Sequence, residues 1–155
     1  MKALVVYDSG FGNTKSIAEA IAAGLTSLQA KAIPVGQLRM EDVAVGDLLV
    51  IGSPINGWQP TQKTMETLAN LSRRGLSGIM AAAFDTRVKL FIHGDAAKKI
   101  AKTLQEAGAI LIAKPMPFYV KGTEGPLLDG ETARATAWAE VLLAQARAQR
   151  TQRSA

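Results

Sequence analysis

The strongest constraint on this chain is an apolar segment that leads through a glycine-containing turn into a helix. Residues 3–7, Ala-Leu-Val-Val-Tyr, contain no polar break, which predicts a strand buried on both faces of a sheet. After the turn, apolar residues recur at helical spacing from Ile17 to Leu25. The first N–H groups of such a helix have no partners within it and lie at the positive end of its dipole. The arrangement therefore predicts a phosphate-binding turn between the strand and the helix.

The residues of this turn, Asp-Ser-Gly-Phe-Gly-Asn-Thr at positions 8–14, suit an anion. Gly10 and Gly12 permit positive φ and let an anion approach the backbone closely. Ser9 and Thr14 each carry a hydroxyl that can donate a hydrogen bond to the same anion.

Two common phosphate motifs do not match the turn. A Walker loop is excluded because Thr14, and not glycine, precedes Lys15-Ser16. A dinucleotide fingerprint is excluded because Lys15 stands where a third small residue is needed. An ordinary strand-to-helix turn with a Ser or Thr cap is the alternative to phosphate binding.

Further apolar segments alternate with helical patterns along the rest of the chain. Strands are predicted over residues 30–35, 47–52, 79–84 and 110–113, and helices begin near Thr61, Asp95 and Glu131. This alternation predicts an α/β fold with a doubly wound five-stranded parallel sheet, a three-layer sandwich with helices on both faces. Prolines in the second and fifth strands favour edge positions, which gives the order 2-1-3-4-5.

Finer expectations concern helix faces and connections. The buried stripes are predicted as Met65, Leu68, Ala69 and Leu71 in one helix, and as Trp138, Val141, Leu142 and Ala146 in the last. Residues 36–45 are predicted to be partly helical, and residues 88–93 fit an extended segment. In a sheet of this order, ligands bind beyond the carboxyl ends of the strands, where strands one and three meet. Three loops should converge there: residues 7–15, 53–60 and 84–87.

Composition limits the possible function classes. The chain has 155 residues, 48% of them hydrophobic, which fits one domain over residues 1–150 followed by a basic tail, 151–155. It has no cysteine, which excludes disulfides, thiolate metal sites and thiol catalysis. It has no 18-residue apolar run and no signal-peptide pattern, so we expect a cytoplasmic protein without a membrane partner.

The net charge of +5 is concentrated near the end of the chain, at Arg147, Arg150 and Arg153. No aromatic residues are interleaved with these arginines, so we expect a solvated helix end and no nucleic-acid partner.

His93, the only histidine, has no carboxylate cluster at metal spacing, and no serine has a histidine partner in a triad pattern. We therefore predict neither metal ligands nor catalytic residues.

Several motifs together resemble those of the flavodoxin family over the whole chain. These are Ser9-x-x-Gly12-Asn13-Thr14, Gly52-Ser53-Pro54, Asn56-Gly57, Phe84-Asp85-Thr86-Arg87 and the segment from Lys121 to Leu127. The short segment after the fifth strand resembles the short-chain members. The resemblance implies the flavodoxin-like sandwich and flavin mononucleotide (FMN) as cofactor. It also implies that the first loop holds the phosphate and that the second and third loops flank the isoalloxazine ring.

The resemblance gives a set of expected FMN-binding residues. They are Ser9, Gly10, Phe11, Gly12, Asn13 and Thr14 in the first loop, Pro54, Ile55, Asn56, Gly57 and Trp58 in the second, and Asp85, Thr86 and Arg87 in the third. In the family the peptide at the position of Gly57 rotates as the flavin is reduced. Trp58 offers a π-face for stacking. Arg87 either stabilises reduced flavin or is a solvated arginine.

Three functions fit these features. The first is an electron carrier that shuttles one or two electrons through bound FMN to a redox partner protein, which the basic charge suggests is acidic. The second is an FMN-dependent NAD(P)H/quinone oxidoreductase, because the third loop has no tyrosine to cover one ring face. The third is a flavin-free interaction module on the same scaffold.

Overall fold

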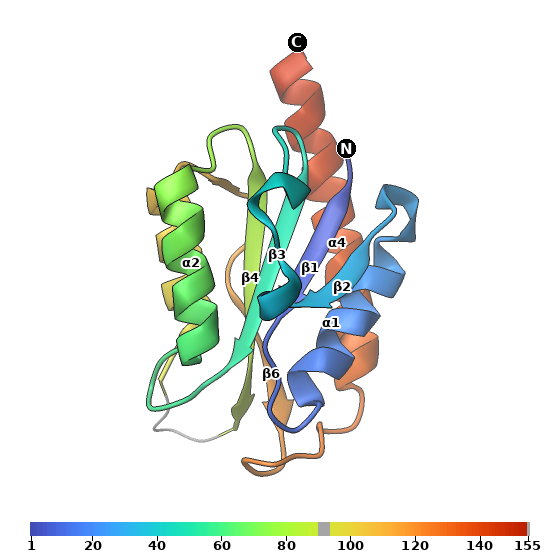
Figure 1. Cartoon of the computed structure of the whole chain (residues 1–155). Helices are drawn as coiled ribbons and strands as arrows, with labels where there is room; N and C mark the ends of the chain where they lie inside the picture. The colour runs from blue at the N-terminus through green and yellow to red at the C-terminus, as the bar shows by residue number, and fades with distance from the viewer. Residues whose placement is uncertain (90–93, 155) are drawn as a thin grey trace.

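A computed structural model gives the structure of the chain and describes residues 1–89 and 94–154 (Figure 1). The strands are β1 (Ala3–Tyr7), β2 (Lys31–Pro34), β3 (Leu48–Pro54), β4 (Met80–Val88), β5 (Ile110–Leu111) and β6 (Met116–Val120). The helices are α1 (Asn13–Gly24), α2 (Gln62–Arg74), α3 (Ala96–Glu106) and α4 (Glu131–Ser154). Short 3-10 turns are η1 (Thr26–Leu28), η2 (Val35–Gln37) and η3 (Met40–Asp42). The strand order β2-β1-β3-β4-β5 and the parallel pairing confirm the predicted fold class.

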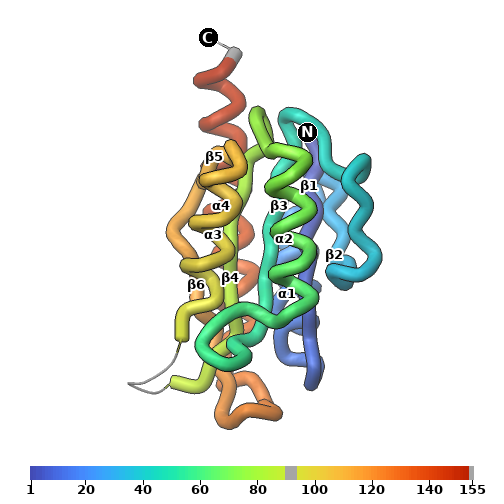
Figure 2. The backbone as a smooth tube through the Cα atoms, turned by 60° about the vertical axis from the view of Figure 1, so that its left-hand side comes forward, coloured from blue at the N-terminus to red at the C-terminus, as the bar shows by residue number. Residues whose placement is uncertain are grey.

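The sheet is covered on both faces. Because successive side chains of a strand point to opposite faces, Val5 and Val50 pack against α1 and α4, whereas Val6 and Ile51 pack against α2 and α3. All four side chains are fully buried. Figure 2 shows α2 and α3 side by side in front of the sheet. The result is the expected three-layer sandwich.

The fifth strand differs from the prediction because it is divided in two. β5 pairs with the first half of β4, and β6 pairs with its second half, so the sheet has six strands within the described residues. β4 is nine residues long, which leaves room for both partners along one edge. Pro115 and Pro117 supply no N–H donor, which suits an interruption and an edge position. The predicted edge position of this segment is confirmed.

An aromatic cluster fixes the second half of β4 against α4. The rings of Phe84, Phe118 and Trp138 meet edge to face, with centroids 6.0–6.3 Å apart. A Cβ on Gly52, the β3 neighbour of Phe84, would lie inside 3.0 Å of the Phe84 ring. Glycine at position 52 therefore lets this ring pack over β3.

Two predicted helix faces need correction. In α2 Ala69 is exposed, Met65 is only half-buried and Thr64 is buried, because the stripe facing the sheet starts one residue earlier. In α4 Val141 is 50% exposed.

The buried residues of α4 are Ala135, Trp138, Ala139, Leu142 and Ala146. Small residues let α4 approach α1 closely, since a Cβ on Gly24 would lie 2.6 Å from that of Ala139. Residues 151–154, expected as a tail, continue this helix.

The connection at residues 36–45 contains parts of the 3-10 turns η2 and η3, in place of a regular helix. Of the segment at 88–93, Val88 ends β4, and residues 90–93, including His93, lie outside the described residues. Among the helices that the structure describes, none is long and apolar enough to cross a membrane.

Candidate functional site

A cleft of about 710 Å³ lies at the carboxyl end of the sheet, the lower end in Figure 1. The three loops predicted to converge do meet here, together with the start of α2. The lining residues are Asp8, Ser9, Gly10, Phe11, Asn13, Thr14, Pro54, Ile55, Asn56, Thr61, Gln62, Lys63, Thr86, Arg87, Val88, Val120 and Thr123. Of the predicted site residues, Gly12, Gly57, Trp58 and Asp85 are not part of this lining.

The first loop leaves the start of α1 open to an anion. Gly12 has φ 90°, in the left-handed region, and no side chain caps the helix. Ser9 Oγ instead accepts a hydrogen bond from the Gly12 N–H, at 3.0 Å. Among the described residues, the N–H groups of residues 13–15 have no hydrogen-bond partner. Unpaired amides at the positive end of a helix dipole form a seat for a phosphate.

The Thr14 hydroxyl has a partner within the protein. The side chain of Thr14 is buried, and its Oγ1 lies 2.8 Å from Thr86 Oγ1. This hydrogen bond joins the first loop to the third loop beneath the cleft. The backbone N–H of Thr14 remains available at the helix start.

The last loop packs on the first. Asn13 Nδ2 donates to the carbonyl oxygen of Glu124 at 3.2 Å. Gly125 has φ 105°, and a Cβ there would lie 2.6 Å from Asn13 Oδ1. Glycine at position 125 therefore allows the side chain of Asn13 to connect residues at opposite ends of the sequence.

A serine and a tight turn shape the second loop. The buried Ser53 Oγ accepts from the Thr61 N–H at 3.0 Å, which closes the base of the loop. Asn56 and Gln59 pair through backbone hydrogen bonds at 2.7 and 3.3 Å. The two residues between them have positive φ, 58° at Gly57 and 72° at Trp58, as in a type I′ turn.

Trp58 is held outward by this turn. Trp58 is 60% exposed. Its backbone packs so closely against Gly94 that a Cβ on residue 94 would overlap the Trp58 backbone. A bulky residue at positive φ is an uncommon, strained conformation. Trp58 therefore stands at the edge of the cleft, beside the start of α3.

The third loop carries a buried ionic cluster. Asp85 is fully buried and accepts from Arg87 Nε at 2.9 Å, from Arg87 Nη2 at 2.5 Å and from the Ala97 N–H at 2.9 Å. Arg87 Nη2 also contacts Asp95 Oδ1 at 3.1 Å, and Asp95 caps α3. Asp85 therefore holds Arg87 and the first turn of α3 in place, and only Arg87 reaches the cleft.

Burial and polar contacts act against each other on the pKa values of Asp85 and Arg87. Burial raises the pKa of Asp85 above its usual value, against the lowering effect of the hydrogen bonds from Arg87 and Ala97. Burial also opposes the charge on Arg87, but the contacts with Asp85 and Asp95 outweigh it and raise the pKa of the guanidinium. Arg87 is therefore a fixed, paired cation and not a solvated one.

Seven lining residues are not among the predicted FMN-binding residues, although Asp8 lies in the predicted first loop and Thr123 in the segment from Lys121 to Leu127: Asp8, Thr61, Gln62, Lys63, Val88, Val120 and Thr123. Three of them belong to the start of α2. The signal for these was present, because Thr61 was recognised as a helix cap and helices that follow parallel strands begin at the carboxyl edge. Val120 and Thr123 depend on β6, which the sequence did not reveal.

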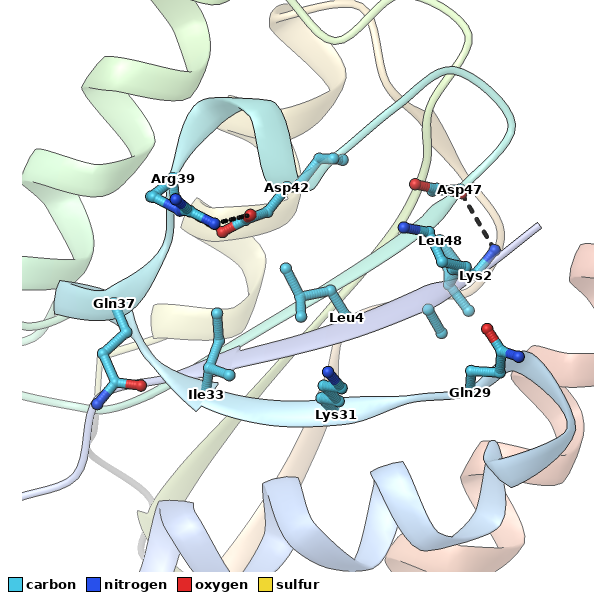
Figure 3. A pocket seen from close by; sticks show the side chains of 12 residues that line it. Lys2, Leu4, Gln29, Lys31, Ile33, Gln37, Arg39, Asp42, Asp47 and Leu48 are labelled. Carbon is cyan, nitrogen blue, oxygen red and sulfur yellow. Dashed lines mark hydrogen bonds and ion pairs between the residues drawn. The ribbon is translucent and has the colours of Figure 1, made fainter.

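A second cavity of about 360 Å³ lies at the amino end of β1 and β2 (Figure 3). Leu4 and Ile33 contribute apolar side chains to it. Its two carboxylates have partners within the protein: Asp47 accepts from the Lys2 N–H at 3.1 Å, and Asp42 pairs with Arg39 at 3.5 Å. In the part of the chain that the structure describes, no group of three side chains is arranged to hold a metal ion.

Comparison with known families gives a match over most of the chain. The family model described as "Flavodoxin" matches residues 5–138. A flavodoxin of Aquifex aeolicus is 35% identical over 92 residues, which are 55% of this chain and 49% of that protein. The match thus spans about half the length of that relative.

Solved structures agree in fold. A flavodoxin from the domain Archaea has a TM-score of 0.80 at 23% identity, over 95% of this chain and 99% of that one. Flavodoxin 2 of Bacillus cereus has a TM-score of 0.78 at 21% identity, over 94% and 99%. The rubredoxin oxygen:oxidoreductase of Desulfovibrio gigas has a TM-score of 0.77 at 19% identity, over 99% of this chain and 37% of that protein.

Proposed function

The chain belongs to the flavodoxin family, and we propose that it binds FMN in the cleft and carries electrons to and from a redox partner protein in the cytoplasm. The observation that carries this proposal is the open start of α1, where unpaired N–H groups face a cleft of about 710 Å³. That volume lies within the range of small-molecule and cofactor sites. Bound FMN supplies the redox chemistry, since it accepts and donates one or two electrons.

The phosphate would be held by the first loop. The N–H groups of residues 13–15 and the hydroxyl of Ser9 are the donors available there. Lys15, exposed in the first turn of α1, adds a positive charge nearby. Gly12 keeps the backbone in the left-handed conformation that turns these amides outward.

The ring would lie between the second and third loops. Pro54, Ile55, Val88 and Val120 give apolar walls, as a flat aromatic ligand requires. Asn56 and Thr86 offer polar groups at the edge of that space. Trp58 reaches the ring only through a change in the turn at residues 56–59, because this turn holds it outside the lining.

A second function is favoured by one observation. The third loop lines the cleft with Thr86, Arg87 and Val88, and none of these is aromatic. If no aromatic side chain covers that ring face, as among these described third-loop residues, space remains for a second substrate, as an FMN-dependent NAD(P)H/quinone oxidoreductase needs. Turnover of NAD(P)H with a quinone by the isolated, FMN-loaded protein would decide for this enzyme over the carrier.

The test of FMN binding is a titration followed by quenching of flavin fluorescence. Gly12→Ala strains the first loop, because alanine is disfavoured at φ 90°. Gly46→Ala is the matched control: it has φ 92°, an equally open environment and a position at the opposite end of the sheet. We expect both variants to lose similar stability, about 1 kcal/mol, and only Gly12→Ala to lose FMN affinity. No binding of FMN at micromolar concentration by the unaltered protein would contradict the proposal and favour the flavin-free interaction module.

A further inference from the structure

Lysines occupy the first turns of the three helices that begin beside the cleft. Lys15 is the third residue of α1, Lys63 the second of α2, and Lys98 and Lys99 follow the first two residues of α3. None of these first turns contains an acidic residue. A cation at this position is unfavourable, because it lies at the positive end of the helix dipole. Such local conflicts with stability occur mostly at functional surfaces.

Three of these lysines lie in the first turns of α2 and α3, and one of them contacts the loop that carries the exposed Trp58. Lys99 Nζ donates to Gln59 Oε1 at 2.9 Å, which places it against the second loop. The backbone of Trp58 packs on Gly94, close to the start of α3. Lys63 lies at the start of α2, on the same face of the sheet (Figure 2). We call Trp58, Lys63, Lys98 and Lys99 the lysine–tryptophan patch; all four residues are exposed.

Two acidic residues near the start of α3 are already engaged, and Glu66, three residues after Lys63 in α2, accepts a hydrogen bond from Gln62. Asp95 Oδ1 accepts from the Lys98 N–H at 2.8 Å and pairs with Arg87. Asp85 is buried beneath Arg87. The three exposed lysines of the patch and the exposed Trp58 therefore offer positive charge and an aromatic side chain at this end of α2 and α3.

We propose that the lysine–tryptophan patch is the docking surface for an acidic face of an electron-transfer protein; this rests on the proposed FMN-binding function. Positive charge around the mouth of the cleft speeds encounter with a negatively charged partner and orients it. Trp58 provides the kind of exposed aromatic side chain that dominates interface energetics. Both features lie at the end of the sheet that holds the cleft, so a partner bound there faces the cofactor.

The test measures binding without electron transfer. The probe is an oxidised acidic [2Fe–2S] ferredoxin, titrated calorimetrically into the oxidised, FMN-loaded protein at low and at physiological ionic strength. We expect binding at low ionic strength that salt weakens. Lys98→Glu with Lys99→Glu should weaken it at least about tenfold, since both charges are reversed within the interface.

The matched control is Lys31→Glu with Arg150→Glu. It changes the net charge equally, at the start of β2 and near the end of α4, both at the other end of the molecule. This control should bind the ferredoxin within about twofold of the wild type, since distant charges are screened. Both variants should bind FMN normally, and Lys98→Glu with Lys99→Glu should melt no lower than the wild type, because glutamate suits a helix start.

Four results would overturn the docking proposal while FMN still binds. Two concern the ferredoxin: no binding to the wild type, or an equal loss of binding in both double variants. The other two are tighter binding of basic cytochrome c than of ferredoxin, and binding to anionic phospholipid vesicles, in place of the ferredoxin, that depends on Lys98 and Lys99. Failure of the wild type to bind FMN is a separate result and refutes the proposed function.

Discussion

Gly52→Ala tests how the aromatic cluster shapes the sheet beneath the cleft. The added methyl would overlap the ring of Phe84, and both positions are fully buried within β3 and β4. Overpacking of a dense core costs about 1–3 kcal/mol. Displacing the ring also weakens its edge contacts with Phe118 and Trp138, each worth about 0.5–1.5 kcal/mol. We expect a total loss of about 3 kcal/mol in the free energy of unfolding.

A double-mutant cycle in urea isolates the cause. Phe84→Leu removes the ring that the new methyl meets, so Gly52→Ala should cost less than about 1 kcal/mol in that background, a coupling of about 2 kcal/mol. Gly36→Ala is the control for the substitution itself, because a Cβ at position 36 meets nothing within 4 Å. It should leave stability unchanged or slightly raised. Equal costs of Gly52→Ala in both backgrounds would refute the steric explanation.

Two further predictions concern buried carboxylates and have opposite dependence on pH. Glu131 accepts from the Tyr119 N–H at 2.7 Å and from Arg134 at 3.0 Å; burial raises its pKa, but these contacts outweigh burial and lower it. The stabilisation that Glu131 provides is therefore present above its unfolded-state pKa and is lost as pH falls through its lower folded-state pKa. Glu131→Gln should cost about 1.5–3 kcal/mol in the free energy of unfolding at neutral pH. In urea melts at a series of pH values, this variant should lose less stability on acidification than the wild type, and an equal loss would contradict this. Arg87→Gln leaves the Asp85 carboxylate buried without its cationic partner, at a cost of about 3–5 kcal/mol. Because the folded-state pKa of Asp85 is raised further in this variant, part of its stability should return as pH falls, and a thermal midpoint that only declines with acid would count against the assignment.

The sequence was most informative where one physical requirement dominates. Ala3–Tyr7 was predicted with its observed bounds, because an uninterrupted apolar run between polar neighbours has few alternatives. Thr61 was predicted as a helix cap, and its side chain accepts from the Thr64 N–H. Pro34 marked an edge strand correctly, since proline cannot donate to a neighbouring strand.

The remaining features depend on contacts between residues distant in the sequence. The division of the fifth strand follows from the length of β4; Pro115 and Pro117 are compatible with an interruption, but the pairing of both pieces with one strand cannot be read from residues 110–120 alone. Val141 lies on the apolar stripe of α4 by spacing, yet the face that packs on α1 is the one carrying Ala139, and Val141 is exposed. The hydrogen bond between Thr14 and Thr86 requires both loops to be in place. The sequence therefore predicted where the three loops meet but could not give the pairing of their side chains.

The hydrogen bond from Asn13 to the Glu124 carbonyl has a consequence for how the cleft forms. During synthesis the ribosome releases residue 13 long before residue 124, so the wall of the cleft stays incomplete until most of the polypeptide has emerged. If the cleft binds a small molecule, as proposed, we expect its capture to be a late event in maturation, after residues 13 and 124 have come together. By mass action, a molecule bound only in this closed arrangement raises the melting temperature of the whole domain as its concentration increases.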